Sequence, residues 1–237
     1  MKFFRKLAAA ASMVGLLAGA PVSAQQQPKQ IRQLLAMTPA DHARLVKIVD
    51  HDLETVAKFD THASFQFKQG LLGVVWNDIF LRAFVDKTTG KLSIQTYFRF
   101  RGEASTWPRF EVANFRTPEG IQSADLDRIF SDVSCSGVSR YGGNCAYLEE
   151  AVFNIDEQLA RNIAATYAVG AGMPWAIRFK GQSGLNVDME ILPAEMAGLL
   201  KRVDDYRTTL GLEIDEVEAD GDLLPTAPMW SEPGREE

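Results

Sequence analysis

Apolar residues recur at three- and four-residue steps over residues 38–58, and this spacing predicts an amphipathic helix. Thr38 can cap the helix, Pro39 suits its first turn, and Asp41 stands where a capping box places an acid. The apolar stripe consists of Leu45, Ile48, Val49, Leu53 and Val56. We therefore expect the first helix to run from Thr38 to about Lys58.

Beyond residue 62 the apolar pattern alternates, which is typical of half-buried strands. The residues from Asp86 to Lys91 predict a hairpin turn, with Gly90 in a left-handed conformation. The expected strands around this turn cover residues 63–67, 79–86, 92–100 and 110–115.

The second half of the chain mixes both periods. Ser123 is expected to cap a short helix whose apolar residues are Leu126, Ile129 and Phe130. Asp156 is expected to cap another helix, and Pro193 to open a last helix that stops at Gly211. Strands are expected over 147–155, 175–179 and 187–191.

Strands arrive in neighbouring groups rather than alternating with helices, which predicts an α+β fold. We expect one mostly antiparallel sheet of about six to seven strands, with helices packed on one face and solvent on the other. Residues 98–103 resemble residues 177–182, and each segment ends an expected strand that precedes a turn, a strand and a helix. One hypothesis is a duplicated strand–turn–strand–helix unit, and the other is convergence of amphipathic strands.

Residues 1–24 have the pattern of a secretory signal peptide, with basic residues, an apolar run and small residues before the expected cleavage site. The alternative is a membrane anchor, but the run is shorter than the roughly 20 residues needed to span a bilayer. The remaining chain has no second apolar run of that length. We expect a mature chain with a polar linker over 25–37 and a single domain over 38–211, located in the periplasm or secreted.

Acidic residues concentrate at the C-terminus. The formal net charge is −6, and residues 213–237 contain nine acidic residues against Arg235 alone. This composition predicts an acidic, disordered tail over 212–237, whose few apolar residues either anchor a partner or have no role. The rest of the mature chain is close to neutral, which argues against a nucleic-acid partner.

The two cysteines, Cys135 and Cys145, are separated by nine residues in a glycine- and serine-rich segment. An exported protein meets an oxidising environment in which such a pair forms a disulfide. The alternatives are free thiols and a redox or metal site, but Cys-x-x-Cys spacing is absent and a zinc site needs four ligands. We predict a structural disulfide, with no metal and no cofactor.

Established catalytic motifs are missing from the sequence. Asp60 and His62 are two apart at the start of an expected strand, so both side chains point the same way, and they are the candidate catalytic pair. Asp188 and Glu190 share a strand face at a separation that suits an inverting glycosidase. The alternative for these acids is cross-strand pairing with basic residues. Ser183 lies in a near match to a nucleophile elbow that lacks the closing glycine.

Three tryptophans, Trp76, Trp107 and Trp175, lie at expected strand ends or in adjacent loops and are the candidate binding residues. Tryptophans in such places either stack on a ligand or close the ends of a core. The apolar segment 70–76 is either a contact for a ligand or partner or a buried crossover.

Three functions fit this sequence. The first is an exported, non-catalytic protein that binds an envelope protein partner or a small apolar ligand. The second is a secreted hydrolase whose site is assembled from distant residues, with His62 and the sheet acids as the first candidates. The third is an envelope structural or assembly factor that acts through segment 70–76. We favour the first, because an exported near-neutral domain without a catalytic motif fits it best.

Overall fold

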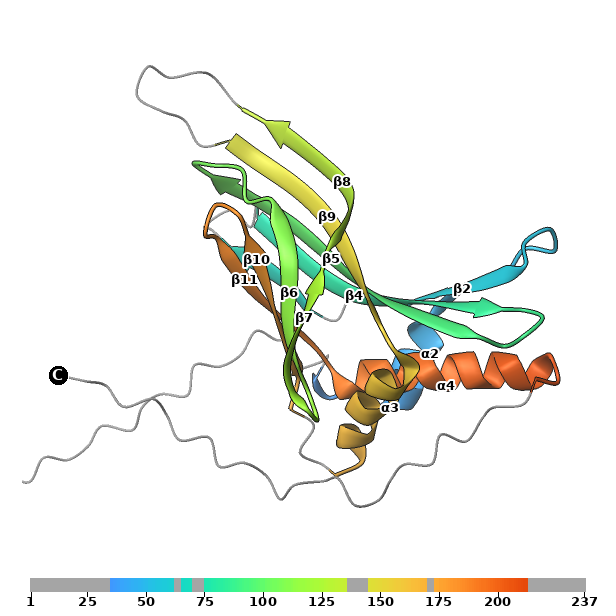
Figure 1. Cartoon of the computed structure of the whole chain (residues 1–237). Coiled ribbons are helices and arrows are strands. Elements are labelled where there is room, and N and C mark those ends of the chain that lie inside the picture. The colour runs from blue at the N-terminus through green and yellow to red at the C-terminus, as the bar shows by residue number, and fades with distance from the viewer. Residues whose placement is uncertain (1–34, 62–64, 70–74, 136–144, 170–172, 213–237) are drawn as a thin grey trace, which may run out of the picture.

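The computed structural model describes residues 35–61, 65–69, 75–135, 145–169 and 173–212 (Figure 1). In this part of the chain, two antiparallel sheets and three α-helices form an α+β fold, as predicted. The expected signal peptide over 1–24, most of the linker over 25–37 and nearly all of the expected tail over 212–237 lie outside the described residues. No helix within the described ranges combines the length and apolarity that crossing a membrane requires.

The larger sheet has the strand order β1-β2-β4-β5-β9-β8, and β3 also pairs with β4. The long strands β4 and β5 form the hairpin predicted at Gly90, whose φ is +73°. The strands of this sheet are β1 (Lys47–Val49), β2 (Val56–Asp60), β3 (Phe65–Gln69), β4 (Val75–Asp86), β5 (Leu92–Ala104), β8 (Asp127–Ser134) and β9 (Cys145–Ile155).

A second, four-stranded sheet has the order β11-β10-β6-β7, whereas the sequence predicted one sheet. Its strands are β6 (Phe110–Thr117), β7 (Gly120–Asp125), β10 (Trp175–Gly181) and β11 (Asn186–Ile191). It packs on the larger sheet through aromatic rings: Phe98 stacks on Phe179 with the ring centroids 3.8 Å apart, and Phe115 stacks on Phe153 at 5.2 Å. Two packed sheets bury apolar side chains that a single sheet would leave in water.

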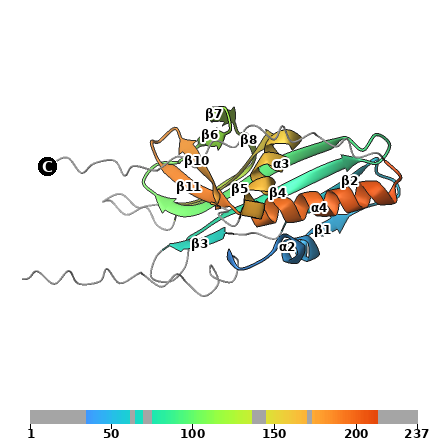
Figure 2. The same ribbon diagram turned by 90° about the horizontal axis from the view of Figure 1, so that it is seen from below.

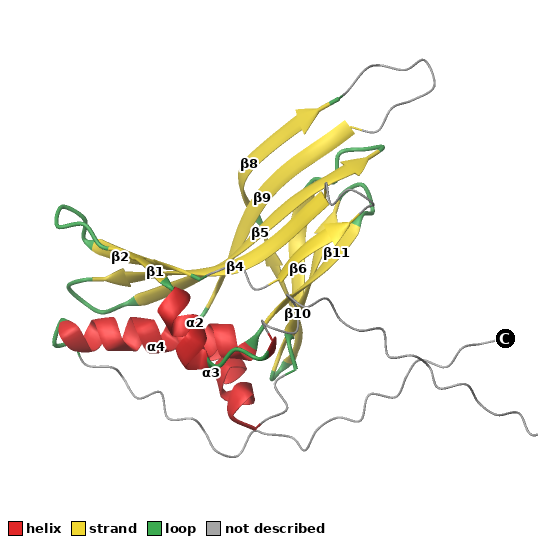
Figure 3. Ribbon diagram, turned by 180° about the vertical axis from the view of Figure 1, so that it is seen from behind, coloured by secondary structure: helices red, strands yellow, loops and turns green. Residues whose placement is uncertain are grey.

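Three helices pack beside the second sheet, next to the β4–β5 hairpin (Figures 1 and 3). They are α2 (Pro39–Leu45), α3 (Glu157–Ala165) and α4 (Pro193–Thr209), and a 3₁₀ turn (Thr166–Val169) follows α3. Thr38 and Asp41 form the predicted capping box of α2, and the Asp156 carboxylate accepts from the backbone N–H of Leu159 to cap α3. The view from below shows α4 lying along the larger sheet (Figure 2).

One face of the larger sheet carries the hydrophobic core. Its buried residues alternate along β2, β5 and most of β4, as the sequence pattern predicts, and the helices and the second sheet supply the facing side chains. The fully buried large side chains are Phe59, Phe98, Phe110, Phe153, Phe179, Ile79, Leu81, Ile94, Ile177, Met189, Ile191 and Met196.

The expected helix over 38–58 is wrong beyond Leu45. The chain leaves helical geometry at Val46 and forms β1, whose residue Ile48 lies opposite Phe59 of β2. A turn at His51 to Glu54 leaves Leu53 88% exposed. Residues 46–56 contain five β-branched side chains, which favour strands, and pairing with β2 decides between the two periods.

The expected short helix at Ser123 is also wrong. Residues 120–134 form β7 and β8, and the two strands belong to different sheets. The apolar positions around Ile129 and Phe130 are too few to distinguish the period of a helix from that of a strand, so the local pattern is ambiguous. Pairing of β8 with β9 resolves it.

The hypothesis of a duplicated unit fails because different elements follow the two similar segments. In the described part of the chain, β5 is followed by four strands and no helix before α3 begins, whereas β10 is followed by one strand and then α4. The two similar segments lie in different sheets and face each other through Phe98 and Phe179. Their resemblance reflects two amphipathic strands that contribute to one core.

Candidate functional site

The candidate catalytic residue Asp60 lies on the face of β2 that points away from the core. Its carboxylate accepts a hydrogen bond from Nε of Arg82, and its other oxygen lies 3.6 Å from Nζ of Lys58. His62 lies outside the described residues, so the predicted pairing of Asp60 with His62 stays a prediction. Asp60 thus forms a cross-strand ion pair with Arg82 of β4, and Lys58 approaches it from the same strand.

The paired acids of the sheets are bound to basic residues or backbone groups. Asp188 accepts two hydrogen bonds from Arg178, at 2.6 and 2.8 Å, and these bonds lower the pKa of Asp188 against the opposing effect of burial. Glu150 pairs with Arg99 at 2.7 Å. The predicted cross-strand pairing is therefore confirmed for Asp188, and Glu150 pairs in the same way, whereas Glu190 makes no ion pair within the described residues. The lowered pKa of Asp188 suits an ion pair better than a catalytic acid.

Glu149 points to the opposite face of β9 from Glu150 and is buried. Its two carboxylate oxygens accept hydrogen bonds from the backbone N–H groups of Arg109 and Phe110, at 2.8 and 3.0 Å. Arg109 has a left-handed φ of +48° at the point where the chain enters the second sheet. Glu149 thus satisfies the backbone of this crossing between sheets.

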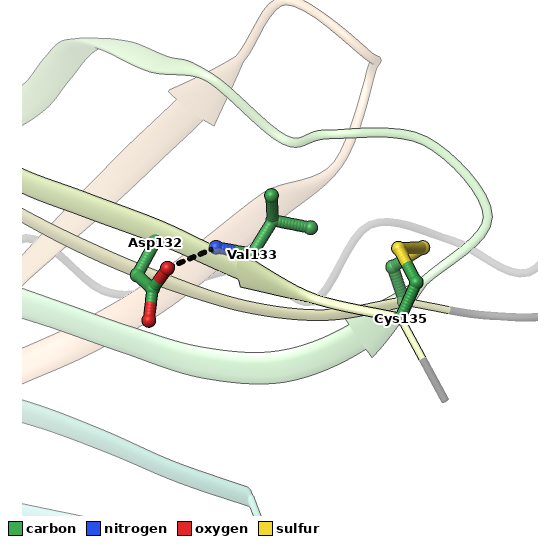
Figure 4. The surroundings of a disulfide bond; sticks show 4 residues. Asp132, Val133 and Cys135 are labelled. Carbon is green, nitrogen blue, oxygen red and sulfur yellow. Dashed lines mark hydrogen bonds between the residues drawn. A yellow bond between two sulfur atoms is a disulfide. The ribbon is translucent and has the colours of Figure 1, made fainter. Parts of the chain in front are cut away.

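The two cysteines form the predicted disulfide (Figure 4). Ser134 pairs with Ala146, so Cys135 and Cys145 stand opposite each other where β8 ends and β9 begins, with their Cα atoms 4.3 Å apart. The disulfide therefore joins an edge strand to its neighbour. No group of three or more histidine, cysteine, aspartate or glutamate side chains that could hold a metal occurs in the described ranges.

Of the three candidate tryptophans, Trp107 and Trp175 each pack against aromatic side chains of the core. Trp175 is 7% exposed, packs against Phe115 and donates its indole N–H to the carbonyl of Arg116 at 2.9 Å. Trp107 is half-buried against Tyr147, 5.8 Å between ring centroids. The side chain of Trp76 and most of segment 70–76 lie outside the described residues.

Strand β8 forms one edge of the larger sheet and is exposed on both faces. Seven of its eight residues are exposed, and the eighth is half-buried. Ile129, Phe130 and Val133 are 48%, 47% and 41% exposed, although each is a large apolar side chain. Figure 1 shows β8 at the far side of the sheet from the helices. An edge strand of this kind is a ready template for pairing with another chain.

A cavity of about 270 Å³ lies where edge strand β11 passes over the larger sheet. Asn77 of β4 and Phe100 of β5 line it from the larger sheet, and the residues from Leu185 to Met189 line it from the second sheet. Asn77 is 2% exposed. The cavity therefore combines apolar walls with a buried amide.

Sequence reasoning missed both of these features. A lone asparagine in a strand carries no local signal, and Asn77 becomes notable only when the second sheet covers it. Ile129 and Phe130 were assigned to the apolar face of a helix, which concealed their exposure on a strand edge. The β-branched residues Ile129 and Val133 are the one local signal that favours the strand β8 over a helix.

Comparison with known proteins gives no relative: no family model, curated protein or solved structure matches this chain.

Proposed function

We propose that this chain is an exported, non-catalytic protein that binds an envelope protein partner along the edge of β8. The observation that carries the proposal is the exposure of Ile129, Phe130 and Val133 on an eight-residue edge strand. Edge strands are normally short, charged or covered, because an open apolar edge pairs with other chains indiscriminately.

The contact mode that fits β8 is addition of an extended partner segment. In an antiparallel pair with β9, alternate backbone groups of β8 point away from β9 and remain on the outer edge. An added strand would pair with those groups, while apolar side chains above and below would pack on Phe130 and Val133. The register shift between Arg128 and Phe130 confines regular pairing to the last five residues of β8.

The disulfide supports this role. It closes the end of the β8–β9 hairpin, so that β8 is held as a strand although no element covers its faces in the described part of the chain. A pre-formed strand loses less conformational freedom on binding than a flexible segment does. The oxidising environment that the disulfide requires agrees with export.

The test of export is the mass of the protein recovered from the envelope of its own cells. The expected mature chain begins at Gln25 and contains no alkylatable thiol. A chain that keeps residues 1–24 and stays in the reducing compartment would contradict the proposal.

The test of partner binding uses a photo-crosslinking residue at position 130 in living cells, with position 53 as a matched control. Leu53 is an exposed leucine in the β1–β2 turn, away from the edge of β8. The protein captured at position 130 is then purified, and its affinity for the oxidised chain is measured by titration.

We expect Phe130→Asp to weaken that affinity by about 30-fold or more, because a central apolar contact is lost and a charge is buried. Leu53→Asp should change it by less than about twofold. Equal affinities for the two variants would exclude β8 as the binding surface, even if the partner itself is real.

A further inference from the structure

The cavity beneath β11 has a size and lining suited to a small molecule. Its volume is about 270 Å³, whereas a protein cavity of about 150 Å³ is enough to hold benzene. By proportion it takes a molecule of about ten non-hydrogen atoms. None of the residues that line it belongs to β8, so the site is separate from the proposed partner surface.

Asn77 provides the polar feature of this cavity. Its side chain is on the core-facing side of β4, and its amide oxygen has no hydrogen-bond partner among the residues that the structure describes. An unpaired buried amide oxygen costs free energy that a hydrogen bond from a ligand would recover. A ligand with an N–H or O–H group directed at Asn77 therefore gains affinity that a purely apolar molecule does not.

The remaining described walls are mixed and offer a charged ligand no free counter-charge. Phe100, Leu185, Val187 and Met189 supply apolar surface around the amide of Asn77, and Asn186 adds a second, neutral amide. Asp188 is the one ionisable residue among the lining residues, and its carboxylate is already held by two hydrogen bonds from Arg178. Among the described lining residues, no charge is left for a ligand to neutralise.

We infer that this cavity binds a neutral, apolar molecule of about ten non-hydrogen atoms that carries one hydrogen-bond donor for the amide of Asn77. A fused bicyclic ring with a single N–H has this chemistry. Indole is therefore the probe, and 1-methylindole, which lacks the donor, is its matched control.

The experiment titrates the oxidised chain with each probe and follows the backbone amide shifts of β4 and β11 by NMR. Indole should shift both strands and bind at least about fivefold more tightly than 1-methylindole, because only indole can satisfy Asn77. Equal affinities, or no shift in these strands up to the solubility limit of indole, would overturn the inference.

Two variants separate a binding role of Asn77 from a structural one. Asn77→Leu should raise the melting temperature of the free protein and abolish the preference for indole, since the unpaired amide is gone. Asn154→Leu, at an exposed strand position, should leave the preference unchanged. A lower melting temperature together with a retained preference would show that Asn77 is structural.

Filling the cavity gives an independent check. Val187→Trp should block indole binding while Asn77 stays in place, and it should leave partner affinity at β8 unaltered. Persistent indole binding in this folded variant would place the probe elsewhere and overturn the inference, without bearing on β8.

Discussion

Individual charged side chains fasten the helices to the larger sheet. Arg207 of α4 donates to the carbonyl of Gly90 in the β4–β5 hairpin at 2.8 Å and to both carboxylate oxygens of Glu157. Arg161 of α3 joins the same cluster through Glu157 and Asp204. Because Arg207 is buried, loss of an acidic partner leaves its charge poorly compensated.

The first prediction concerns the pH dependence of this cluster. Burial raises the pKa of Glu157, but hydrogen bonds from Arg207 and Arg161 outweigh burial and hold the pKa below its usual value. A carboxyl group with a lowered pKa stabilises the fold above its unfolded pKa of about 4.3, and this stabilisation is lost as the pH falls through the folded value.

Glu157→Gln should therefore lower the free energy of unfolding by about 1–3 kcal/mol at pH 7, and the deficit should shrink as the pH falls below about 4. Urea denaturation at both pH values measures this difference. Asp205→Asn, which breaks the exposed pair with Lys201 on α4, is the control and should cost less than about 1 kcal/mol. A deficit for Glu157→Gln that is independent of pH would contradict the assignment.

At the scale of elements, the close approach of α2 to α4 depends on a glycine. A Cβ atom at Gly198 would lie 2.6 Å from Cβ of His42 and 2.8 Å from the carbonyl oxygen of Pro39. These distances are too short for real contacts, so α2 would have to move. The short helix is thus positioned by the absence of a side chain in α4.

Gly198→Ala should lower the free energy of unfolding by about 1–3 kcal/mol through overpacking, although alanine is the better helix former. Its neighbour Ala197 is half-buried on the same helix, and Ala197→Gly should cost about 1 kcal/mol by helix propensity alone. Thermal denaturation of both variants checks the pair. Stabilisation by Gly198→Ala would mean that the two helices are not packed this closely.

The disulfide is the second device at this scale, because it holds β8 on β9. Replacing both Cys135 and Cys145 by serine should lower the free energy of unfolding by roughly 2–3 kcal/mol, as expected for a loop of this size. The double serine variant should remain folded, since the hydrophobic core does not include residues of β8. Denaturation curves of the oxidised protein and the variant, recorded without reductant, make the comparison; identical curves would contradict a stabilising role.

Elements with local signals could be predicted from the sequence, and those decided by distant contacts could not. Alternation from Leu92 to Phe100 and the cap at Asp156 predicted β5 and α3, since both signals lie within the element. The stripe from Leu45 to Val56 fits a helix equally well, and only pairing with β2 makes part of it a strand. The division into two sheets and the burial of Asn77 depend on contacts across the whole chain.

At the scale of the whole molecule, the core faces the helices and the second sheet, while β8 extends away from both (Figure 1). The stable body and the proposed binding edge are therefore separate parts of one fold. Substitutions on β8 should change the affinity for the partner without lowering the free energy of unfolding much. Substitutions in the core should lower the free energy of unfolding and leave the contact surface of β8 itself unaltered. This separation makes the binding surface testable without loss of the fold.

Hydrogen–deuterium exchange of the β8 amides in the isolated, oxidised chain tests the central claim most directly. If β8 is an open edge, its outward-pointing amides at residues 130–134 should exchange far faster than those of β5, and they should become protected when the captured partner is added. Protection of these amides equal to that of β5 in the isolated monomer would show that the edge is already covered, and would contradict the claim.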